Sequence, residues 1–169
     1  MKKFIQNQSS IKPKISNHLM IGCSAIIGIF FLDQVTKFIA VSLLPFGQVI
    51  EIIPILSFIL VYNTGVSFSL FSGASIFILI PVSLTVIFIV AWMWLKTSNS
   101  QSAAFGYGMI IGGAFGNLVD RIYRDGVVDF ILFHIGSWSF AVFNIADSAI
   151  SIGVVLLLFD TFRSQNDKI

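Results

Sequence analysis

Long apolar stretches alternate with short polar segments along the chain, and this pattern predicts four membrane-spanning helices. The stretches lie at about residues 19–42, 74–95, 102–121 and 140–160. Each has about 20 residues, the length that an α-helix needs to cross the hydrocarbon core of a bilayer. We therefore interpret residues 19–162 as one domain of four transmembrane helices, with polar tails at residues 1–18 and 163–169.

The segment between the first two spans has a different pattern. Its apolar run VIEIIPILSFILVY contains Pro54 and is too short for a span. Its β-branched residues favour strands, or an apolar element that lies on the membrane surface. A further strand is predicted at Val127–Phe133, after a turn at Gly126 in the connection between the third and fourth spans.

The composition excludes a soluble globular protein. Hydrophobic residues make up 56% of the chain and charged residues 11%, whereas a soluble domain carries about 25% charged residues. The net charge of +2 gives no indication of nucleic-acid binding. A single cysteine, Cys23, excludes an internal disulfide and a Cys-based zinc cluster, and the two histidines lie far apart in the sequence. We expect no metal and no other cofactor.

The distribution of lysine and arginine predicts the orientation of the spans. Four lysines lie in residues 1–18, one lies in the loop at 96–101, and the C-terminal tail holds one lysine and one arginine. Segment 43–73 holds neither, although the connection at 120–139 holds Arg121 and Arg124. Because cytoplasmic loops are enriched in these residues, we expect both termini in the cytoplasm and the intramembrane polar groups near the outer face.

Asp33 and Lys37 lie four residues apart in the first span, so they share a helix face and can pair. One interpretation is a snorkelling pair, whose charged heads reach water at the helix end. The other is that Asp33 is deep and contributes to a polar core. The spacing is compatible with both.

The third span has glycines at every fourth position, at Gly108, Gly112 and Gly116. Small residues at this spacing make one helix face smooth and let a second helix approach closely. The same helix ends in Asn117, Asp120 and Arg121, which lie at i, i+3 and i+4, so three polar groups are presented together.

The fourth span carries one polar stripe, formed by Asn144, Asp147, Ser148 and Ser151. The pattern places Asp147 about two turns inside the span. An ionised carboxylate near the middle of a bilayer costs about 2.5–3.5 kcal/mol on insertion scales, which indicates a functional role. Asp129 lies near the start of the predicted outer strand. We hypothesise that these two carboxylates meet as an acid–base pair.

Asn63 and Gly65 form a weaker motif after the apolar segment. Gly65 permits a tight turn that would aim the Asn63 amide at a neighbouring group. The intramembrane polar groups of separate segments are all expected at one depth, which indicates a shared site.

Five stretches together resemble the lipoprotein signal peptidases, also called signal peptidase II. They are Asp33-Gln-Val-Thr-Lys37, Asn63-Thr-Gly-Val-Ser-Phe-Ser69, Gly112-Gly-Ala-Phe-Gly-Asn-Leu-Val-Asp-Arg121, Val127-Val-Asp-Phe130 and Phe143-Asn-Ile-Ala-Asp147. The resemblance covers about residues 20–160. One departure is Ser67, where the family more often has alanine, and the N-terminal tail lies outside the resemblance.

The resemblance implies an aspartic endopeptidase of the bacterial inner membrane, which cuts diacylglyceryl-modified prolipoproteins on the N-terminal side of the lipidated cysteine. By position, Asp129 and Asp147 match the catalytic pair. The supporting polar residues are Asp33, Lys37, Asn63, Gly65, Asn117, Arg121 and Asn144. The family also implies an all-α membrane fold with a small extracytoplasmic β-rich cradle, here about residues 44–70, and an outer loop.

The resemblance further implies that the enzyme uses no metal and is inhibited by the cyclic peptide globomycin. We expect membrane lipid around the protein and a monomer. Two other functions remain compatible with intramembrane charges, namely a small transporter or proton channel and a lipid-binding scaffold without catalysis. The clustering of the polar groups at one depth and the lack of a visible inverted repeat argue against the transporter.

Overall fold

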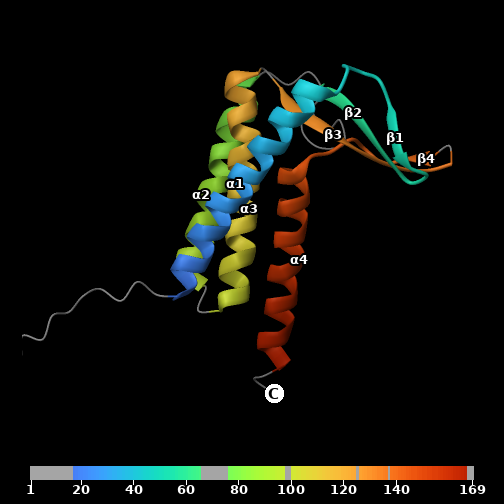
Figure 1. The fold of residues 1–169 in the computed structure, drawn as a ribbon. Coiled ribbons are helices and arrows are strands. Elements are labelled where there is room, and N and C mark those ends of the chain that lie inside the picture. The colour runs from blue at the N-terminus through green and yellow to red at the C-terminus, as the bar shows by residue number, and fades with distance from the viewer. Residues whose placement is uncertain (1–16, 66–75, 98–99, 125, 137, 167–169) are drawn as a thin grey trace, which may run out of the picture.

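The computed structural model describes residues 17–65, 76–97, 100–124, 126–136 and 138–166, and its helices form one bundle (Figure 1). The helices are α1 (Asn17–Leu43), α2 (Ile76–Thr97), α3 (Gln101–Tyr123) and α4 (Ile145–Asn166). The strands are β1 (Ile50–Ile53), β2 (Leu56–Asn63), β3 (Val127–Ile135) and β4 (Trp138–Ser139). All four helices are long and apolar enough to cross a membrane, and with the small sheet they confirm the predicted fold class.

Helix α3 is the central helix of the bundle and is buried along most of its length, whereas α1, α2 and α4 expose most of theirs. Its glycines allow this position. A Cβ at Gly108 would lie 2.5 Å from the carbonyl oxygen of Gly22 in α1, and a Cβ at Gly113 would lie 2.6 Å from that of Ala146 in α4. Gly108, on the predicted smooth face, thus packs backbone to backbone against α1, and Gly113, which was not part of that prediction, does so against α4.

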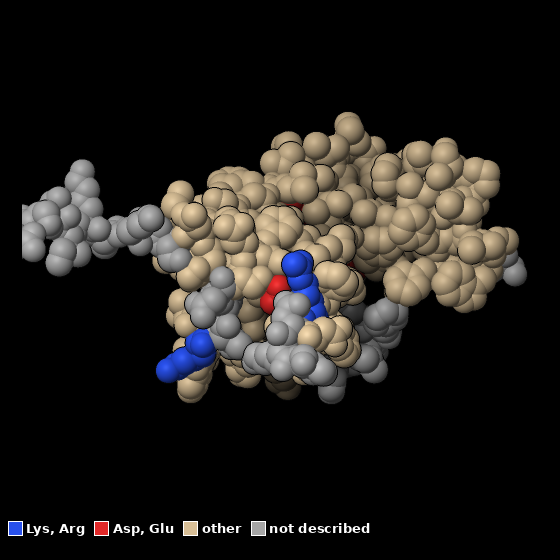
Figure 2. Space-filling view, turned by 90° about the horizontal axis from the view of Figure 1, so that it is seen from below, with Lys and Arg blue, Asp and Glu red and all other residues tan. Residues whose placement is uncertain are grey.

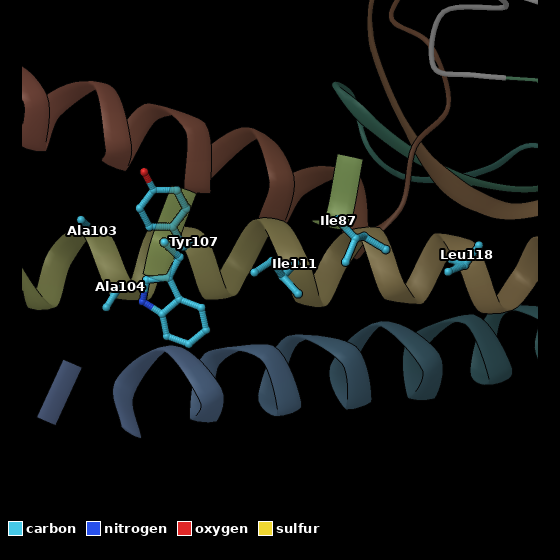
Figure 3. Close-up of a cluster of buried hydrophobic side chains, with 7 residues drawn as sticks. Ile87, Ala103, Ala104, Tyr107, Ile111 and Leu118 are labelled. Atoms are coloured by element: carbon cyan, nitrogen blue, oxygen red, sulfur yellow. The ribbon is translucent and has the colours of Figure 1, made fainter. Parts of the chain in front are cut away.

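An apolar cluster fills the space between α3 and its neighbours (Figure 3). Its α3 members include Tyr107, Ile111 and Leu118, and α2 contributes Ile87 and Trp94. The Trp94 ring lies against α1 so closely that a Cβ at Gly22 would be 2.1 Å from it. The cluster packs α2 and α3 together, with partly buried residues of α1 such as Leu19 and Ile26 against it.

The four strands form one antiparallel sheet in the order β1-β2-β3-β4, which projects sideways from one end of the bundle (Figure 1). The predicted strands in 44–70 are β1 and β2, and residues 66–70 lie outside the described part of the chain. The predicted strand at 127–133 is β3, which extends to Ile135. Its pairing with β2 sets Asp129 opposite Val61 and Val127 opposite Asn63, so both segments of the site meet in this sheet.

The side chains facing away from the bundle are mostly apolar, as expected for surfaces in contact with lipid. Seen from the end opposite the sheet, most of the described residues in view are neither acidic nor basic, and few Lys, Arg, Asp and Glu side chains are visible (Figure 2). α1 begins and α4 ends at that same end of the bundle (Figure 1).

One predicted boundary is wrong in a way that changes the site. α4 begins at Ile145 and not at residue 140, so Asp147 lies in its first turn and not two turns inside a span. Residues 140–144 are not helical, and Phe143 pairs with Ile131 of β3. The apolar run Phe-Ala-Val-Phe is compatible with a helix and with an extended segment, so periodicity could not locate the boundary. At its other end, α4 continues through residues 163–166 of the predicted tail.

Candidate active site

The carboxylates of Asp129 and Asp147 are brought together by Asn144. The Nδ2 group of Asn144 donates a hydrogen bond to Asp129 Oδ1 over 2.7 Å. Its backbone N–H donates to Asp147 Oδ2 over 3.3 Å, and its Oδ1 accepts from the backbone N–H of Asp147 over 2.9 Å. These two reciprocal bonds form a capping box at the start of α4. Asn144 thus starts the helix and contacts both carboxylates.

Two further amides complete the set of hydrogen bonds. Asn63 Nδ2 donates to Asp129 Oδ2 over 3.0 Å, and Asn117 Nδ2 donates to Asp147 Oδ1 over 2.8 Å. Every oxygen of the two carboxylates therefore accepts one hydrogen bond from an amide. A carboxylate oxygen has a second lone pair, so each can still contact a water molecule or a substrate.

Gly65 and Arg121 lie at the edge of this cluster. The backbone N–H of Gly65 donates to Asn63 Oδ1 over 3.0 Å, which closes the predicted turn and aims the Asn63 amide at the site. Arg121 donates to the carbonyl oxygens of Gly65 and Asn117, each over 3.3 Å. Its buried Nε has no hydrogen-bond partner among the described residues. The rest of the predicted motif, residues 66–69, lies outside the described part of the chain.

The ion pair of Asp33 and Lys37 is fully buried, with 2.8 Å between Lys37 Nζ and Asp33 Oδ2, so the interpretation as a snorkelling pair is wrong. Lys37 Nζ also lies 2.8 Å from Asp120 Oδ2 and donates to Asn117 Oδ1 over 2.8 Å. An ammonium group has three hydrogens, so all of its donors are used. The second carboxylate, Asp120, also pairs with Arg124, which balances the charge of the cluster.

Burial raises the pKa of the Asp129 carboxyl from its ordinary value of 3.8 to about 7, and the nearby negative charge of Asp147 adds to this effect. The hydrogen bonds from Asn63 and Asn144 favour the ionised form and oppose the shift. A carboxyl group with this pKa exists in both protonation states near neutral pH. It can therefore exchange a proton during a reaction, as general acid–base catalysis requires.

A cavity of about 620 Å³ opens beside Asp147 and Asn63, between β3, the extended residues 140–144 and α4. It is lined by Asn63, Phe133, Trp138, Phe140, Ala141, Val142, Phe143, Asp147, Ser148, Ile150 and Ser151. Three members of the predicted polar stripe of α4 face this cavity, whereas Asn144 is turned away into the buried cluster. The walls are largely apolar with few polar groups, as in sites that bind an apolar ligand and orient one bond.

The sequence reasoning placed all nine candidate site residues in one region, and the structure brings them together in a continuous set of contacts. No role was predicted for Asp120, although an aspartate in an apolar helix needs a cationic partner and Lys37 was available. The aromatic cavity wall at Phe133, Trp138 and Phe140 was not predicted either, because the apolar pattern of these residues matched a strand and a span equally well. Among the described residues, no cluster of His, Cys, Asp and Glu has the arrangement of a metal site.

The fold and this site define a multi-pass membrane protein that holds a pair of carboxylates at one end of its helix bundle. A family model described as "Signal peptidase (SPase) II" matches residues 25–163. The chain belongs to the signal peptidase II family. It is similar to the lipoprotein signal peptidase of Sinorhizobium fredii, with 43% identity over 76% of this chain and 78% of that protein. It is also similar to that of Allorhizobium ampelinum, with 41% identity over 80% and 83%.

Two solved structures share the fold of this chain. One bacterial membrane enzyme has a TM-score of 0.78 and 27% identity, and the match covers 92% of this chain and 93% of that one. A second has a TM-score of 0.73 and 27% identity, over 88% and 94%. The family and the four apolar helices thus indicate that the chain is a multi-pass protease of the inner membrane. It functions as a lipoprotein signal peptidase, and its substrates are prolipoproteins.

Proposed function

We propose that the chain hydrolyses the peptide bond on the N-terminal side of the diacylglyceryl-modified cysteine of prolipoproteins, with Asp129 and Asp147 as an acid–base pair. The observation that carries this proposal is the contact of both carboxylates with Asn144, beside an apolar cavity. Two neighbouring carboxylates share one proton, because a second negative charge at the same place is costly. One of them is then a base and the other an acid.

The pair performs the reaction by successive proton transfers. The ionised carboxylate takes a proton from a water molecule as the water oxygen attacks the carbonyl carbon of the scissile bond. The protonated partner donates its proton to the carbonyl oxygen. When the C–N bond breaks, the proton held by the first carboxyl group passes to the leaving amine. A hydroxyl group of the tetrahedral intermediate returns a proton to the partner as the new carboxyl group forms, which restores the singly ionised pair. The macroscopic pKa values belong to the pair and not to one residue.

The neighbouring amides have a positioning role in this mechanism. Asn63, Asn117 and Asn144 each direct an N–H group at a carboxylate oxygen, which limits the rotation of both carboxyl groups. Arg121 holds the turn by donating a hydrogen bond to the carbonyl oxygen of Gly65. It also places a positive charge near the pair. This charge favours the singly ionised state of the pair and the developing negative charge on the substrate.

The lipidated substrate explains the position of the site. Residues 19–162 form the peptidase domain, both termini are cytoplasmic, and the carboxylates lie near the extracytoplasmic face. There the substrate's acyl chains remain in lipid while water reaches the scissile bond. A cyclic peptide of the globomycin type competes for the same cavity, since its apolar walls suit such a ligand. We propose a monomer as the active unit, since a single chain supplies both carboxylates and a second copy is not needed for the pair.

The test is cleavage of a diacylglyceryl-modified prolipoprotein and of its unlipidated form by wild type, Asp129→Asn and Asp147→Asn in the same detergent. We expect the wild type to cut only the lipidated precursor efficiently, with a product whose mass begins at the lipidated cysteine. Neither variant is expected to produce it. Processing at the wild-type rate by either variant would disprove the role of the pair, as would processing by both. Equal cleavage of both precursors would disprove the substrate class.

A further inference from the structure

Asp33 and Asp120 both contact Lys37, and each also binds the backbone next to a different carboxylate of the proposed pair. Asp33 Oδ1 accepts a hydrogen bond from the N–H of Ala146 over 3.0 Å, and Asp120 Oδ2 accepts from the N–H of Val128 over 3.1 Å. Ala146 directly precedes Asp147, and Val128 directly precedes Asp129. The two bonds thus hold corresponding points on α4 and β3.

Lys37 links these two holding points. Its Nζ lies 2.8 Å from Asp33 Oδ2 and 2.8 Å from Asp120 Oδ2, and all three side chains are fully buried. Asp33 and Lys37 belong to α1, whereas Asp120 belongs to α3, so the ion triad joins the two helices against which α4 and β3 are placed. The path from Ala146 to Val128 through the three side chains contains four short polar contacts.

The surrounding structure leaves the triad little room to move. A Cβ at Gly116 would lie 2.3 Å from Asp33 Oδ2, so this carboxylate packs directly against the backbone of α3. Arg124 pairs with Asp120 Oδ1, which is not used by Lys37. A buried ion pair adds little to stability compared with apolar packing. We therefore look for the role of the triad in the fixed positions of its side chains and not in a gain of stability.

We infer that Asp33, Lys37 and Asp120 are positioning residues that set the distance between the carboxylates of Asp129 and Asp147. This inference rests on the proposed function, because the triad does not contact the substrate and acts only through the proposed pair of carboxylates. Lys37 also donates to Asn117, the amide that binds Asp147, so loss of its charge disturbs one carboxylate by a second route. Because misplacement by about 1 Å can cost about 100-fold in rate, the triad affects turnover more than substrate binding.

The experiment compares kcat and KM of Lys37→Met and Asp33→Asn for the lipidated precursor, in detergent samples that unfold cooperatively on heating. We expect kcat to fall by about 10- to 100-fold while KM stays within about threefold, since the cavity walls are unchanged. The double variant should lose no more than Lys37→Met alone, because both changes break the same link. Amide hydrogen exchange should rise in the segments containing Val128 and Ala146.

Asp160→Asn is the matched control. It removes a half-buried carboxylate near the end of α4, which accepts a hydrogen bond from Ser100 at the start of α3, away from the triad. We expect its kcat to equal that of the wild type. The inference fails if Lys37→Met and Asp33→Asn keep kcat within about threefold of wild type, or if Asp160→Asn loses as much. If Lys37→Met does not fold, Asp33→Asn decides alone.

Asp129→Asn in the same preparation separates the two proposals. If it is inactive while the triad variants are fully active, only the positioning role is disproved. If Asp129→Asn is as active as wild type, the proposed function is disproved, and the positioning role that rests on it fails with it.

Discussion

Asn144 Nδ2 lies 2.7 Å from Asp129 Oδ1, so an amide at the first turn of a helix holds a carboxylate of a strand. Because the same residue also caps α4 and binds Asp147 through its backbone, the start of the helix and the geometry of the carboxylate pair are one feature. The extended segment before α4 makes this possible, since it lets Asn144 approach β3.

Asn144→Ala should impair catalysis more than folding. It leaves Asp129 Oδ1 without its amide donor and removes the side-chain cap of α4, which costs about 1 kcal/mol of stability. We expect kcat to fall by about 100-fold through misplacement of the carboxyl groups. Thermal unfolding and kcat measured on one preparation check this. A variant that loses stability but keeps the wild-type kcat would contradict the positioning role of Asn144.

Gly113→Ala should separate α4 from α3. Its Cβ would lie 2.6 Å from the carbonyl oxygen of Ala146, and this backbone atom cannot rotate away. We expect lower thermal stability, by about 1–3 kcal/mol for an overpacked site, together with reduced processing. Gly28→Ala in α1 is the control, because no side chain and no atom of a neighbouring segment lies within 4 Å of its added Cβ. That variant should be as stable as wild type or slightly more so, since alanine favours helices. Equal behaviour of both variants would contradict the close packing.

The pH dependence of stability should reveal the buried carboxyl group of Asp129. Its pKa is raised to about 7 in the folded protein, so the folded state binds this proton more tightly than the unfolded state. The resulting stabilisation is present at low pH and is lost as the pH rises from about 4 toward 7. Asp129→Asn carries no such proton. Its stability relative to wild type should therefore rise by about 2 kcal/mol between pH 5 and pH 8. Thermal unfolding of both proteins across this range is the measurement, and parallel pH curves would contradict the shifted pKa.

The sequence allowed the prediction of the four spans because each apolar run is as long as the membrane is thick. The close packing of α3 could also be predicted, since glycines four residues apart lie on the same face of a helix. Asp33 and Lys37 were identified as a pair, but their burial was not, because burial depends on Asp120 of another helix. The start of α4 could not be read from apolar residues that suit both a strand and a helix. It is determined by the contacts of Asn144 with β3.

The proposed pair is tested most directly by single-turnover cleavage of bound lipidated precursor, with saturating enzyme so that binding does not limit the rate. For Asp129→Asn and Asp147→Asn, the account predicts bound precursor and a cleavage rate lower by about 100- to 10,000-fold, the range that a proton-transferring group contributes. Asp160→Asn should cleave at the wild-type rate. Cleavage of bound precursor by either Asn variant at the wild-type rate would contradict the acid–base pair.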